Sequence, residues 1–442
     1  MATPYYRNEK FTSWGRVLRA PHQVAKPYFP DELPELVRGL AEGGPGLAVG
    51  LRRSYGDSNL NPDGRVIDMS GLDRLISFDR TTGIVRAEAG ISLSQLLRVL
   101  VPAGFFLPTT PGTRFVTLGG AIANDVHGKN HHSAGNFGNA VTRLALLRTD
   151  GSGYDVGPGD PMFHAIIGGL GLTGVIVWAE FQAVRIPSST LDAEDTAFEH
   201  VSDYFAIAAE KKETFEHTMA WIDCMTSGAQ LGRGILSSAN WYAHGDLRAH
   251  KELPKKKMPL DAPGFALNPL SIRAFNSVRH DLKTMRQGPY KAHYEPFLYP
   301  LDAITDWNRL YGSKGFYQYQ CVVPPAVAKD ATIQLLKTIS ASGQGSFLAV
   351  LKDFGAIPAQ GLMSFPMEGT TLALDFQNKG EETLRLMSDL DAIVSEAGGR
   401  LYPAKDGRIS GEMFRSGFPK FQEFSAHIDP GLSSAFWKRV SQ

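Results

Sequence analysis

Residues 111–138 read P-G-T-R-F-V-T-L-G-G-A-I-A-N-D-V-H-G-K-N-H-H-S-A-G-N-F-G. Glycine recurs throughout and bulky aliphatic residues are few after Ile122, so this stretch cannot build a core by itself. Glycine lets the backbone adopt positive φ and approach a bound group, and exposed backbone N–H groups can hold phosphates. Cations and donors follow at His127, Lys129, His131 and His132. Because long ordered loops are usually functional, the stretch predicts a binding segment; a surface loop with solvated histidines is the alternative.

Two other glycine segments accompany it. In L-A-V-G-L-R-R-S-Y-G-D-S (47–58) a short strand, 47–49, opens into a loop whose N–H groups and guanidinium groups can converge on a phosphate. The loop lacks the G-x-G-x-x-G spacing of a dinucleotide fold, so a plain strand-to-turn connection is the alternative. In G-G-L-G-L-T-G-V-I-V-W-A-E-F-Q-A-V (168–184) a glycine loop precedes a strongly β-forming run. Such loops suggest one ligand clasped from two sides.

Length and composition exclude several classes of protein. A chain of 442 residues favours two large domains, and 43% hydrophobic with 20% charged residues is ordinary for a globular protein. Because 45 basic residues balance 45 acidic ones, the protein has no net positive charge that would attract nucleic acid. Its two cysteines, Cys224 and Cys321, lack C-x-x-C spacing, which argues against a disulfide framework and a metal site.

No stretch of the sequence indicates secretion or a membrane span. The N-terminal M-A-T-P-Y-Y-R-N-E-K lacks the apolar core of a signal peptide, and no run of about eighteen apolar residues occurs. A cytoplasmic protein is therefore expected. It could still touch a membrane surface.

Hydrophobic periodicity predicts strands and helices in alternation before residue 187. Strands are expected at 47–49, 66–69, 84–89, 140–148 and from 175, and helices at 31–42, 92–101 and 162–167. Ser92 is a plausible N-cap for the second of these helices. After Pro187 the composition changes: aromatic residues become frequent and lie on short runs of alternating character. This pattern favours an antiparallel sheet with covering helices.

Residues 251–296 stand apart from both regions. They combine prolines, clustered lysines and isolated large apolar residues, with no clear strand or long helix. A basic and apolar segment of this kind can rest on anionic lipid, whereas a solvated crossover loop is the alternative.

The order and spacing of several motifs resemble the vanillyl-alcohol oxidase family of flavoproteins. They are G-L-R-R-S-Y-G-D (50–57), P-G-T-R-F-V-T-L-G-G-A-I-A-N-D-V-H-G-K-N-H-H (111–132), G-G-L-G-L-T-G-V-I (168–176), P-L-D-A-I-T-D-W-N-R-L-Y-G-S-K-G-F-Y-Q-Y-Q (300–320), S-F-L-A-V-L-K-D-F-G (346–355) and G-G-R-L-Y-P-A-K-D-G-R (398–408). Within that family the chain is most similar to oxidases of polyprenyl-phosphoryl ribose, nearly end to end.

The resemblance implies an α+β fold, in which a two-subdomain FAD-binding unit of the PCMH type carries an inserted substrate domain built on an antiparallel sheet with covering helices. The implied bounds are 1–187 for the FAD-binding domain, 188–399 for the substrate domain and 400–442 for a C-terminal segment that returns to the FAD-binding domain.

The resemblance also assigns the residues expected to contact FAD. The first pyrophosphate loop comprises Arg52, Arg53, Ser54, Tyr55, Gly56 and Asp57. Along the pyrophosphate, ribityl chain and ring run Thr113, Thr117, Gly119, Gly120, Ala121, Asn124, Asp125, His127 and Gly128. Over the adenosine part lie Gly171, Gly174 and Val175, and from the C-terminal segment come Tyr402 and Lys405. The wider family often attaches the flavin through a histidine of the first loop, but Asp57 stands at the equivalent place here, so FAD is expected to be non-covalent.

The catalytic residues implied are Lys405, Tyr402 and His127. Negative charge develops on a flavin that accepts hydride, so a cation placed there is worth more in the transition state than in the ground state. Lys405 is the first candidate for this cation, and also for proton acceptance if burial lowers its pKa; a lysine that merely ends a strand is the alternative.

The residues implied to bind substrate are Trp14, Lys129, Trp221, Gln318, Gln320 and Lys352. The two glutamines share one strand face because side chains alternate with a period of two, and that face could meet either a sugar or solvent. Ala373 stands where relatives carry a cysteine, so no thiol is required.

The function implied is oxidation of the 2'-hydroxyl of a polyprenyl-phosphoryl-β-D-ribofuranose to the 2'-keto sugar, the first half of an epimerisation to arabinose. A separate short-chain reductase would act on the keto product, and peripheral contact with the inner face of the membrane is expected through 251–296. The alternatives are a soluble sugar, alditol or aldonolactone oxidase and a non-enzymatic flavin-binding module.

Overall fold

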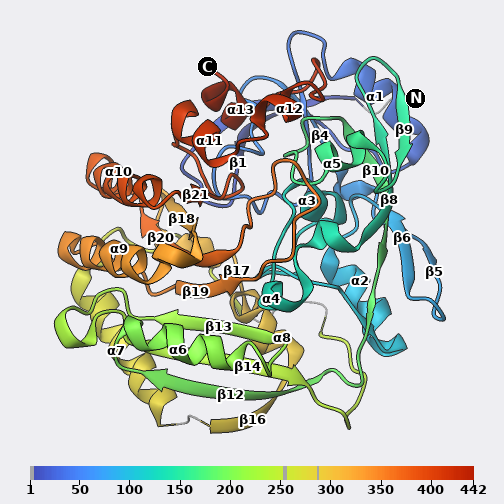
Figure 1. Ribbon diagram of the computed structural model, residues 1–442. Coiled ribbons are helices and arrows are strands. Elements are labelled where there is room, and N and C mark those ends of the chain that lie inside the picture. Colours follow the sequence, from blue (N-terminus) through green and yellow to red (C-terminus); the bar gives the residue numbers. More distant parts are fainter. Residues whose placement is uncertain (1–3, 252–255, 286–287) are drawn as a thin grey trace.

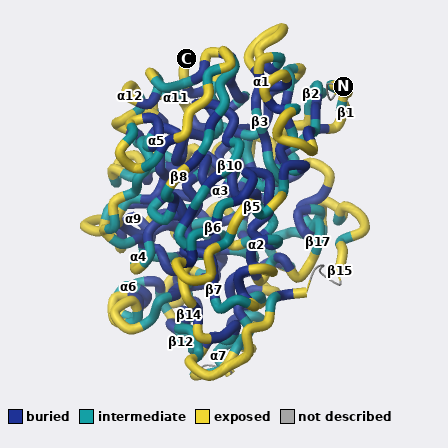
Figure 2. Tube along the Cα trace, turned by 90° about the vertical axis from the view of Figure 1, so that its right-hand side faces the viewer, coloured by how far each residue is buried: buried dark blue, intermediate teal, exposed yellow. Residues whose placement is uncertain are grey.

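A computed structural model describes residues 4–251, 256–285 and 288–442. Helices and sheets are mixed, and most strand pairs are antiparallel (Figure 1). The strands form the buried interior, and exposed residues follow the outer connections (Figure 2). Within these described ranges no helix is long and apolar enough to cross a membrane, and no cluster of three or more histidine, cysteine or acidic side chains is placed to hold a metal ion.

Two sheets are built from the first part of the chain. One has the order β1 (Tyr6–Thr12), β2 (Arg19–Ala25), β4 (Arg65–Asp68) and β3 (Leu47–Val49), with β2 and β3 parallel to β4. The other has the order β5 (Leu75–Phe78), β6 (Ile84–Glu88), β10 (Val175–Gln182), β8 (Val141–Leu147) and β9 (Gly153–Val156). A short pair joins β7 (Phe105–Phe106) to β11 (Val184–Arg185). The strands predicted in this region are confirmed to within two residues.

Helices α1 (Leu33–Gly39), α2 (Leu93–Leu100) and α5 (Pro161–Ile166) accompany these sheets. Ser92 is confirmed as the N-cap of α2: its hydroxyl accepts a hydrogen bond from the Gln95 N–H, and the Gln95 side chain reaches back to the Ser92 N–H. The central glycine-rich stretch is more ordered than a loop. It contains α3 (Leu118–Ala123) and α4 (His131–Ala134), and the Thr117 hydroxyl caps α3 by accepting from the Gly120 N–H.

The rest of the chain builds one antiparallel sheet of eight strands. Its order is β16 (Gly288–His293), β12 (Thr190–Phe198), β14 (Gly234–Trp241), β13 (His217–Ile222), β19 (Ala349–Phe354), β20 (Gly369–Gln377), β18 (Phe316–Val323) and β21 (Arg400–Leu401). Helices α6 (Val201–Lys211), α9 (Ala328–Ser342) and α10 (Glu381–Glu396) pack beside one another along it (Figure 1). This is the helix-covered antiparallel sheet that the aromatic pattern predicted.

The C-terminal segment links this sheet to the N-terminal part. After β21 come α11 (Gly411–Gly417), α12 (Phe421–Ser425) and α13 (Ala435–Val440), which lie near the N-terminal strands (Figure 1). The Ala435 N–H donates to the Leu60 carbonyl, and Arg439 pairs with Asp57 at 2.8 Å. Residues far apart in the sequence are therefore held together beside the loop that follows β3.

The expectation that 251–296 lacks a long helix is wrong. Helix α7 spans Pro269–Thr284, and the Asn268 side chain caps it by accepting from the backbone N–H groups of Leu270 and Ser271. Pro269 opens the helix at its first position, where a missing N–H costs nothing. The same segment contains β15 (Lys256–Lys257), paired with β17 (Ile304–Thr305), and α8 (Tyr294–Leu298) follows β16. Residues 252–255 and 286–287 of that prediction lie outside the described residues.

Candidate active site

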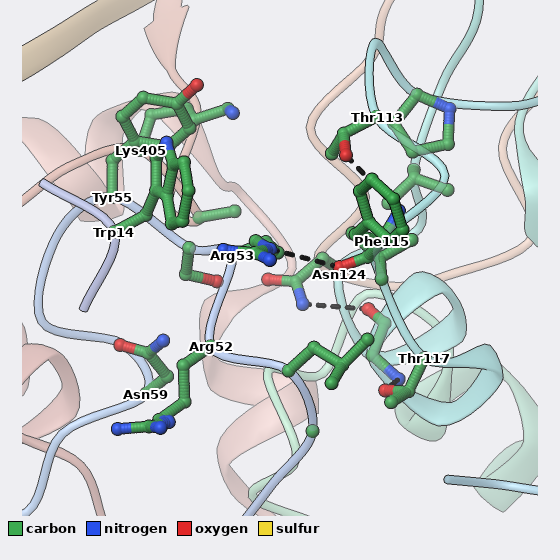
Figure 3. Close-up of a pocket in the computed structure, with 18 of the residues that line it drawn as sticks. Trp14, Arg52, Arg53, Tyr55, Asn59, Thr113, Phe115, Thr117, Asn124 and Lys405 are labelled. Carbon is green, nitrogen blue, oxygen red and sulfur yellow. Dashed lines mark hydrogen bonds between the residues drawn. The ribbon is translucent and has the colours of Figure 1, made fainter. Parts of the chain in front are cut away.

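A cavity of about 520 Å³ lies where the N-terminal part, the eight-stranded sheet and the C-terminal segment meet. Its lining comes from the loop after β3, the segment 111–127, the turn before β10, residues 301–307, the inner strands of the large sheet and the turn after β21. This volume is typical of a sizeable organic ligand. Figure 3 shows the part of the cavity between Trp14, Arg53 and Asn124.

The loop after β3 fixes two guanidinium groups beside the cavity. Arg52 has a positive φ of 53° and stacks over the Phe11 ring at 4.4 Å. Arg53 lies 4.0 Å from the centre of the Trp14 ring, and its Nε donates to the Phe115 carbonyl at 3.2 Å (Figure 3). Neither guanidinium group forms an ion pair with a carboxylate among the described residues, although Asp302 and Asp306 favour the charged form of Arg53, so both groups can meet an anionic ligand.

Asn59 lines the same end of the cavity with its hydrogen-bonding capacity unused. Its side-chain Oδ1 and Nδ2 are both buried, and neither has a hydrogen-bond partner among the described residues. Since a buried amide without partners is costly, this side chain indicates a polar ligand that satisfies it.

Opposite this loop, the backbone of α3 forms a narrow wall. A Cβ added at Gly50 would lie 2.1 Å from Thr117 Oγ1, so only glycine allows the two segments to approach. Asn124 Nδ2 donates to the Gly120 carbonyl at 2.8 Å, and the Tyr402 hydroxyl donates to the Asn124 carbonyl at 3.0 Å. The cavity between α3 and the loop that carries Arg52 and Arg53 therefore offers backbone groups and guanidinium groups to a phosphate-bearing ligand such as FAD.

Three basic side chains, the buried His127 and the half-buried Lys352 and Lys405, mark the other end of the cavity. Burial lowers the pKa of Lys405 to about 7 and that of Lys352 to about 8, and it lowers the pKa of His127 well below its ordinary value. The Lys405 ammonium lies 3.8 Å from the centre of the Tyr55 ring (Figure 3). Neither lysine has an ion pair among the described residues; Lys352 Nζ donates to the Gly128 carbonyl at 3.4 Å.

Gln318 and Gln320 lie on the cavity face of β18, not on a solvent face. Gln320 Nε2 lies 3.0 Å from His127 Nε2, and Gln318 Nε2 donates to Asp375 Oδ1 at 2.6 Å. Tyr319, between them, points the other way and is buried near Arg408 and α10. With their amino groups engaged, both amides have carbonyl oxygens available to accept from ligand hydroxyls.

Most of the residues expected from the sequence line this one cavity. They are Trp14, Arg52, Arg53, Ser54, Tyr55, Thr113, Thr117, Gly119, Gly120, Asn124, His127, Gly171, Gly174, Gln318, Gln320, Lys352, Tyr402 and Lys405. Ala373, noted in place of a cysteine, lies there too.

Four residues expected to contact a ligand have side chains engaged elsewhere and are not among the residues that line the cavity. Trp221 Nε1 donates to the Phe347 carbonyl, and the ring stacks with Arg279. Lys129 Nζ donates to the Leu298 carbonyl at 2.8 Å. The Asp125 carboxylate accepts from Asn136, Ser364 and the Gly138 N–H, and Asp57 pairs with Arg439.

The other four residues outside the lining have roles in packing. Ala121 and Val175 are buried in hydrophobic clusters. Gly128 packs against Thr109 and Thr110, where a Cβ would collide with the Thr109 hydroxyl. Gly56 lies against the backbone of Asp406, which brings the loop after β3 up to the turn that carries Lys405.

The sequence reasoning missed several lining residues. They include Ser58, Asn59, Phe115, Asp302, Thr305, Asp306 and Trp307. Asn59 directly follows Y-G-D-S, and Asp302 lies within P-L-D-A-I-T-D-W. Their closeness to these motifs in the sequence could have identified them. Asp302 Oδ2 accepts from the Arg114 backbone N–H at 2.9 Å, which ties this segment to the central stretch.

Comparisons with known proteins agree with this geometry. Residues 21–157 match the model of an FAD binding domain. The chain is 36% identical to the decaprenylphosphoryl-β-D-ribose oxidase of Mycolicibacterium smegmatis over 435 residues, which cover 94% of this chain and 93% of that protein. The chain belongs to the vanillyl-alcohol oxidase family, in the branch of decaprenylphosphoryl-β-D-ribose oxidase. It is therefore an FAD-dependent oxidoreductase.

Other relatives within the vanillyl-alcohol oxidase family match shorter parts of this chain. The alditol oxidase of a Streptomyces species is 27% identical over 167 residues, which cover 37% of this chain and 40% of that protein. The L-gulono-1,4-lactone dehydrogenase of Mycobacterium tuberculosis is 29% identical over 187 residues, 42% of each chain. The family resemblance seen in the sequence motifs is thereby confirmed, and FAD is the cofactor.

Proposed function

We propose that the chain oxidises the 2'-hydroxyl of a polyprenyl-phosphoryl-β-D-ribofuranose to the 2'-keto sugar, the first half of an epimerisation to arabinose. The observation that carries this proposal is the pair of half-buried lysines, Lys352 and Lys405, which lack ion-pair partners among the described residues and share the cavity with Gln318 and Gln320. Amide carbonyls suit sugar hydroxyls, and uncompensated cations suit a phosphodiester or another electron-rich group. The similarity to decaprenylphosphoryl-β-D-ribose oxidase supports this choice of substrate.

In this proposal, FAD lies between the loop after β3 and α3. Arg52, Arg53 and Asn59 would hold its phosphates, and Thr117 and Asn124 would lie along its length. Bound FAD supplies the acceptor for the hydride that leaves the carbon bearing the hydroxyl.

The roles of the catalytic residues follow from their surroundings. With a pKa of about 7, Lys405 can hold a positive charge in the cavity or take up the hydroxyl proton as the sugar is oxidised. His127 stays neutral because burial and the neighbouring lysines lower its pKa, so it acts as a hydrogen-bonding group beside Gln320. Burial raises the pKa of Tyr402, whose hydroxyl holds the Asn124 backbone in place.

The domain arrangement is also part of the proposal. An FAD-binding domain of 1–187, a substrate domain of 188–399 and a returning segment of 400–442 are supported by β12, where the large sheet begins, and by the contacts of α13 with the loop after β3. The strand β21 lies in the large sheet, so the returning segment first contributes to the substrate domain.

FAD is expected to be bound without a covalent link. Among the lining residues that the structure describes, His127 is the one histidine and there is no cysteine, and Asp57 points to Arg439. Precipitation of the holoprotein with acid should leave the yellow colour in the supernatant, as measured by absorbance. A pellet that keeps the flavin through washing would contradict this.

The exposed face of α7 supports contact with an anionic membrane surface. Leu270, Val278 and Leu282 recur at helical spacing and are 77%, 58% and 52% exposed, while Asn276 and His280 face the interior. The strand β15, which precedes α7 in the chain, carries Lys256 and Lys257 and pairs with Ile304 and Thr305 at the cavity. A lipid-linked substrate could pass from this surface to the site, which fits peripheral contact at the cytoplasmic face of the membrane.

Replacing Val278 and Leu282 by asparagine should weaken binding to phosphatidylglycerol-containing vesicles by about tenfold or more, because two apolar side chains no longer enter the lipid. Co-sedimentation with vesicles measures the effect. Ile76→Asn, which changes an exposed apolar residue on β5, is the matched control. Equal binding by all three proteins, or none by the unaltered chain, would contradict membrane contact through α7.

An anaerobic titration tests the proposed function. Polyprenyl-phosphoryl ribose should bleach the absorbance of bound FAD, while free pentoses, alditols and aldonolactones should do so weakly. Bleaching by the free compounds alone would indicate a soluble sugar, alditol or aldonolactone oxidase. Failure of every compound, in a protein unable to acquire FAD, would favour a non-enzymatic module. A 2'-keto product would be a substrate for a separate short-chain reductase.

A further inference from the structure

Arg439, on the last helix of the chain, contacts two carboxylates from segments that form different walls of the cavity. Its Nη2 donates to Asp57 Oδ1 at 2.8 Å and to Asp406 Oδ2 at 3.0 Å, and its Nε donates to Asp57 Oδ2 at 3.3 Å. Its Nη1 donates to the Ile409 carbonyl. One guanidinium group therefore joins the loop after β3 to the turn after β21.

Both carboxylates are buried, and Arg439 is the cation that pairs with them. Asp57 and Asp406 are 9% and 6% exposed, and in the part of the chain that the structure describes their ion pairs are both with Arg439. The side chain of the nearby Arg408 is paired with Asp391 instead. Because a buried carboxylate without a cation is costly, loss of this guanidinium group would leave two such carboxylates repelling each other.

The two joined segments carry residues of the candidate active site directly beside these carboxylates. Tyr55 lies two residues before Asp57, and Lys405 immediately precedes Asp406. The Lys405 ammonium lies 3.8 Å from the centre of the Tyr55 ring. The Tyr55 N–H donates to the Ala404 carbonyl at 2.9 Å, and the Asp57 N–H donates to the Asp406 carbonyl at 3.3 Å. The contact between Lys405 and Tyr55 therefore depends on how closely the two segments are held.

We infer that Arg439 is a positioning residue, which holds the loop that carries Arg52 and Arg53 against the turn that carries Lys405. A single side chain near the C-terminus thereby sets the separation of two walls of the cavity. The consequences for FAD and substrate rest on the proposed function, whereas the junction between the two segments does not.

The helix that carries Arg439 is attached to the loop side by other contacts as well. The Ala435 N–H donates to the Leu60 carbonyl at 2.7 Å, and Lys438 Nζ donates to Asn61 Oδ1 at 2.9 Å. These contacts do not involve the guanidinium group. Replacing Arg439 therefore removes the link between the loop and the turn but leaves α13 in its place.

Hydrogen exchange, followed by mass spectrometry with fragmentation to single residues, measures this junction at the amides of Tyr55 and Asp57. In Arg439→Met, which removes the charge but keeps a long side chain, these amides should exchange about tenfold faster than in the unaltered holoprotein, because the junction opens more often. Amides in the pair of strands β12 and β14 should exchange as before, which shows that the variant is folded. FAD should also dissociate faster, as measured by flavin fluorescence after dilution.

Arg415→Met is the matched control. Arg415 Nη1 donates to the Val440 and Gln442 carbonyls at 2.9 and 3.1 Å, so it holds the same end of the chain without touching either carboxylate. Exchange at the junction should stay within about twofold of the unaltered protein. Unchanged exchange in Arg439→Met would overturn the inference, as would an equal acceleration in both variants.

Asp57→Asn is a second variant, which decides the matter if Arg439→Met does not fold. It keeps the shape of the side chain and leaves Asp406 paired, so exchange at Tyr55 should rise by about threefold. In the double variant, Tyr55 should exchange more slowly than in Arg439→Met alone, because an asparagine amide does not repel Asp406. Unchanged exchange in Asp57→Asn, or faster exchange in the double variant than in Arg439→Met, would contradict a link through this ion pair.

Hydrogen exchange requires neither substrate nor turnover, so its result is separate from the success or failure of the proposed function. With FAD saturating, polyprenyl-phosphoryl ribose should bleach the flavin of Arg439→Met about tenfold more slowly or worse, because Lys405 is misplaced. If exchange accelerates as expected but no sugar bleaches the unaltered protein, the proposed function fails and the positioning role of Arg439 stands.

Discussion

Lys405→Ala should reduce the rate of substrate-dependent flavin bleaching by about 10²- to 10³-fold, the usual effect of removing one preorganised group that stabilises charge in a transition state. Lys405 lies over the Tyr55 ring in the same cavity as Lys352 and Gln318, so in the proposed arrangement its ammonium would lie beside the reacting groups. FAD should stay bound, because the loop after β3 and α3 supply the rest of its surroundings. Stopped-flow absorbance measures the rate, and the ratio of flavin to protein absorbance measures occupancy.

Lys405→Arg separates the two roles open to this lysine. Arginine keeps the positive charge but cannot accept a proton. Recovery of most of the rate would assign Lys405 an electrostatic role, and a rate as low as that of the alanine variant would assign it proton transfer. Unchanged turnover in Lys405→Ala would remove the residue from the mechanism.

Gly56→Ala should destabilise the protein by about 3 kcal/mol and release FAD more readily. A Cβ at position 56 would lie 1.5 Å from the Asp406 carbonyl oxygen, which is a backbone atom and cannot swing aside. The Tyr55 N–H donates to the Ala404 carbonyl here, so separating the two segments would also displace Lys405. Chemical denaturation gives the free energy of unfolding, and flavin fluorescence reports release.

Gly159→Ala is the control for this substitution. No atom lies within 4 Å of a Cβ at position 159, so its free energy of unfolding should change by less than about 0.5 kcal/mol. Equal stability of the Gly56 and Gly159 variants would show that the contact with Asp406 is not a constraint.

Local patterns were sufficient to predict much of the fold. Ser92 and Gln95 form the N-terminal capping box that the sequence indicates, and β10 follows its glycine loop as expected. Helix α7 was missed because the segment combines prolines, clustered lysines and isolated apolar residues, although Pro269 occupies the first turn of the helix, which tolerates proline. Its pattern is also inverted, with apolar residues outside and Asn276 and His280 inside, so a search for a buried apolar stripe fails.

The site was predictable where a motif carries its own chemistry. Arginines, glycines and Lys405 lie in recognisable loops, and these residues meet in one cavity. The direction of a side chain was harder to predict. Lys129 lies within the central motif, and Trp221 lies on β13, but their side chains donate to the backbone carbonyls of Leu298 and Phe347. Arg439 had no signal at all, since its partners Asp57 and Asp406 are brought to it by tertiary packing.

The turn after β21 sets the time at which the protein can acquire its cofactor during synthesis. A ribosome finishes every strand of the large sheet, β21 last, before it adds Tyr402 and Lys405, which complete one wall of the cavity. A nascent chain that stops before residue 400 also lacks the partner of Gly56 and the arginine that pairs with Asp57. Stable capture of FAD should therefore follow translation of this segment.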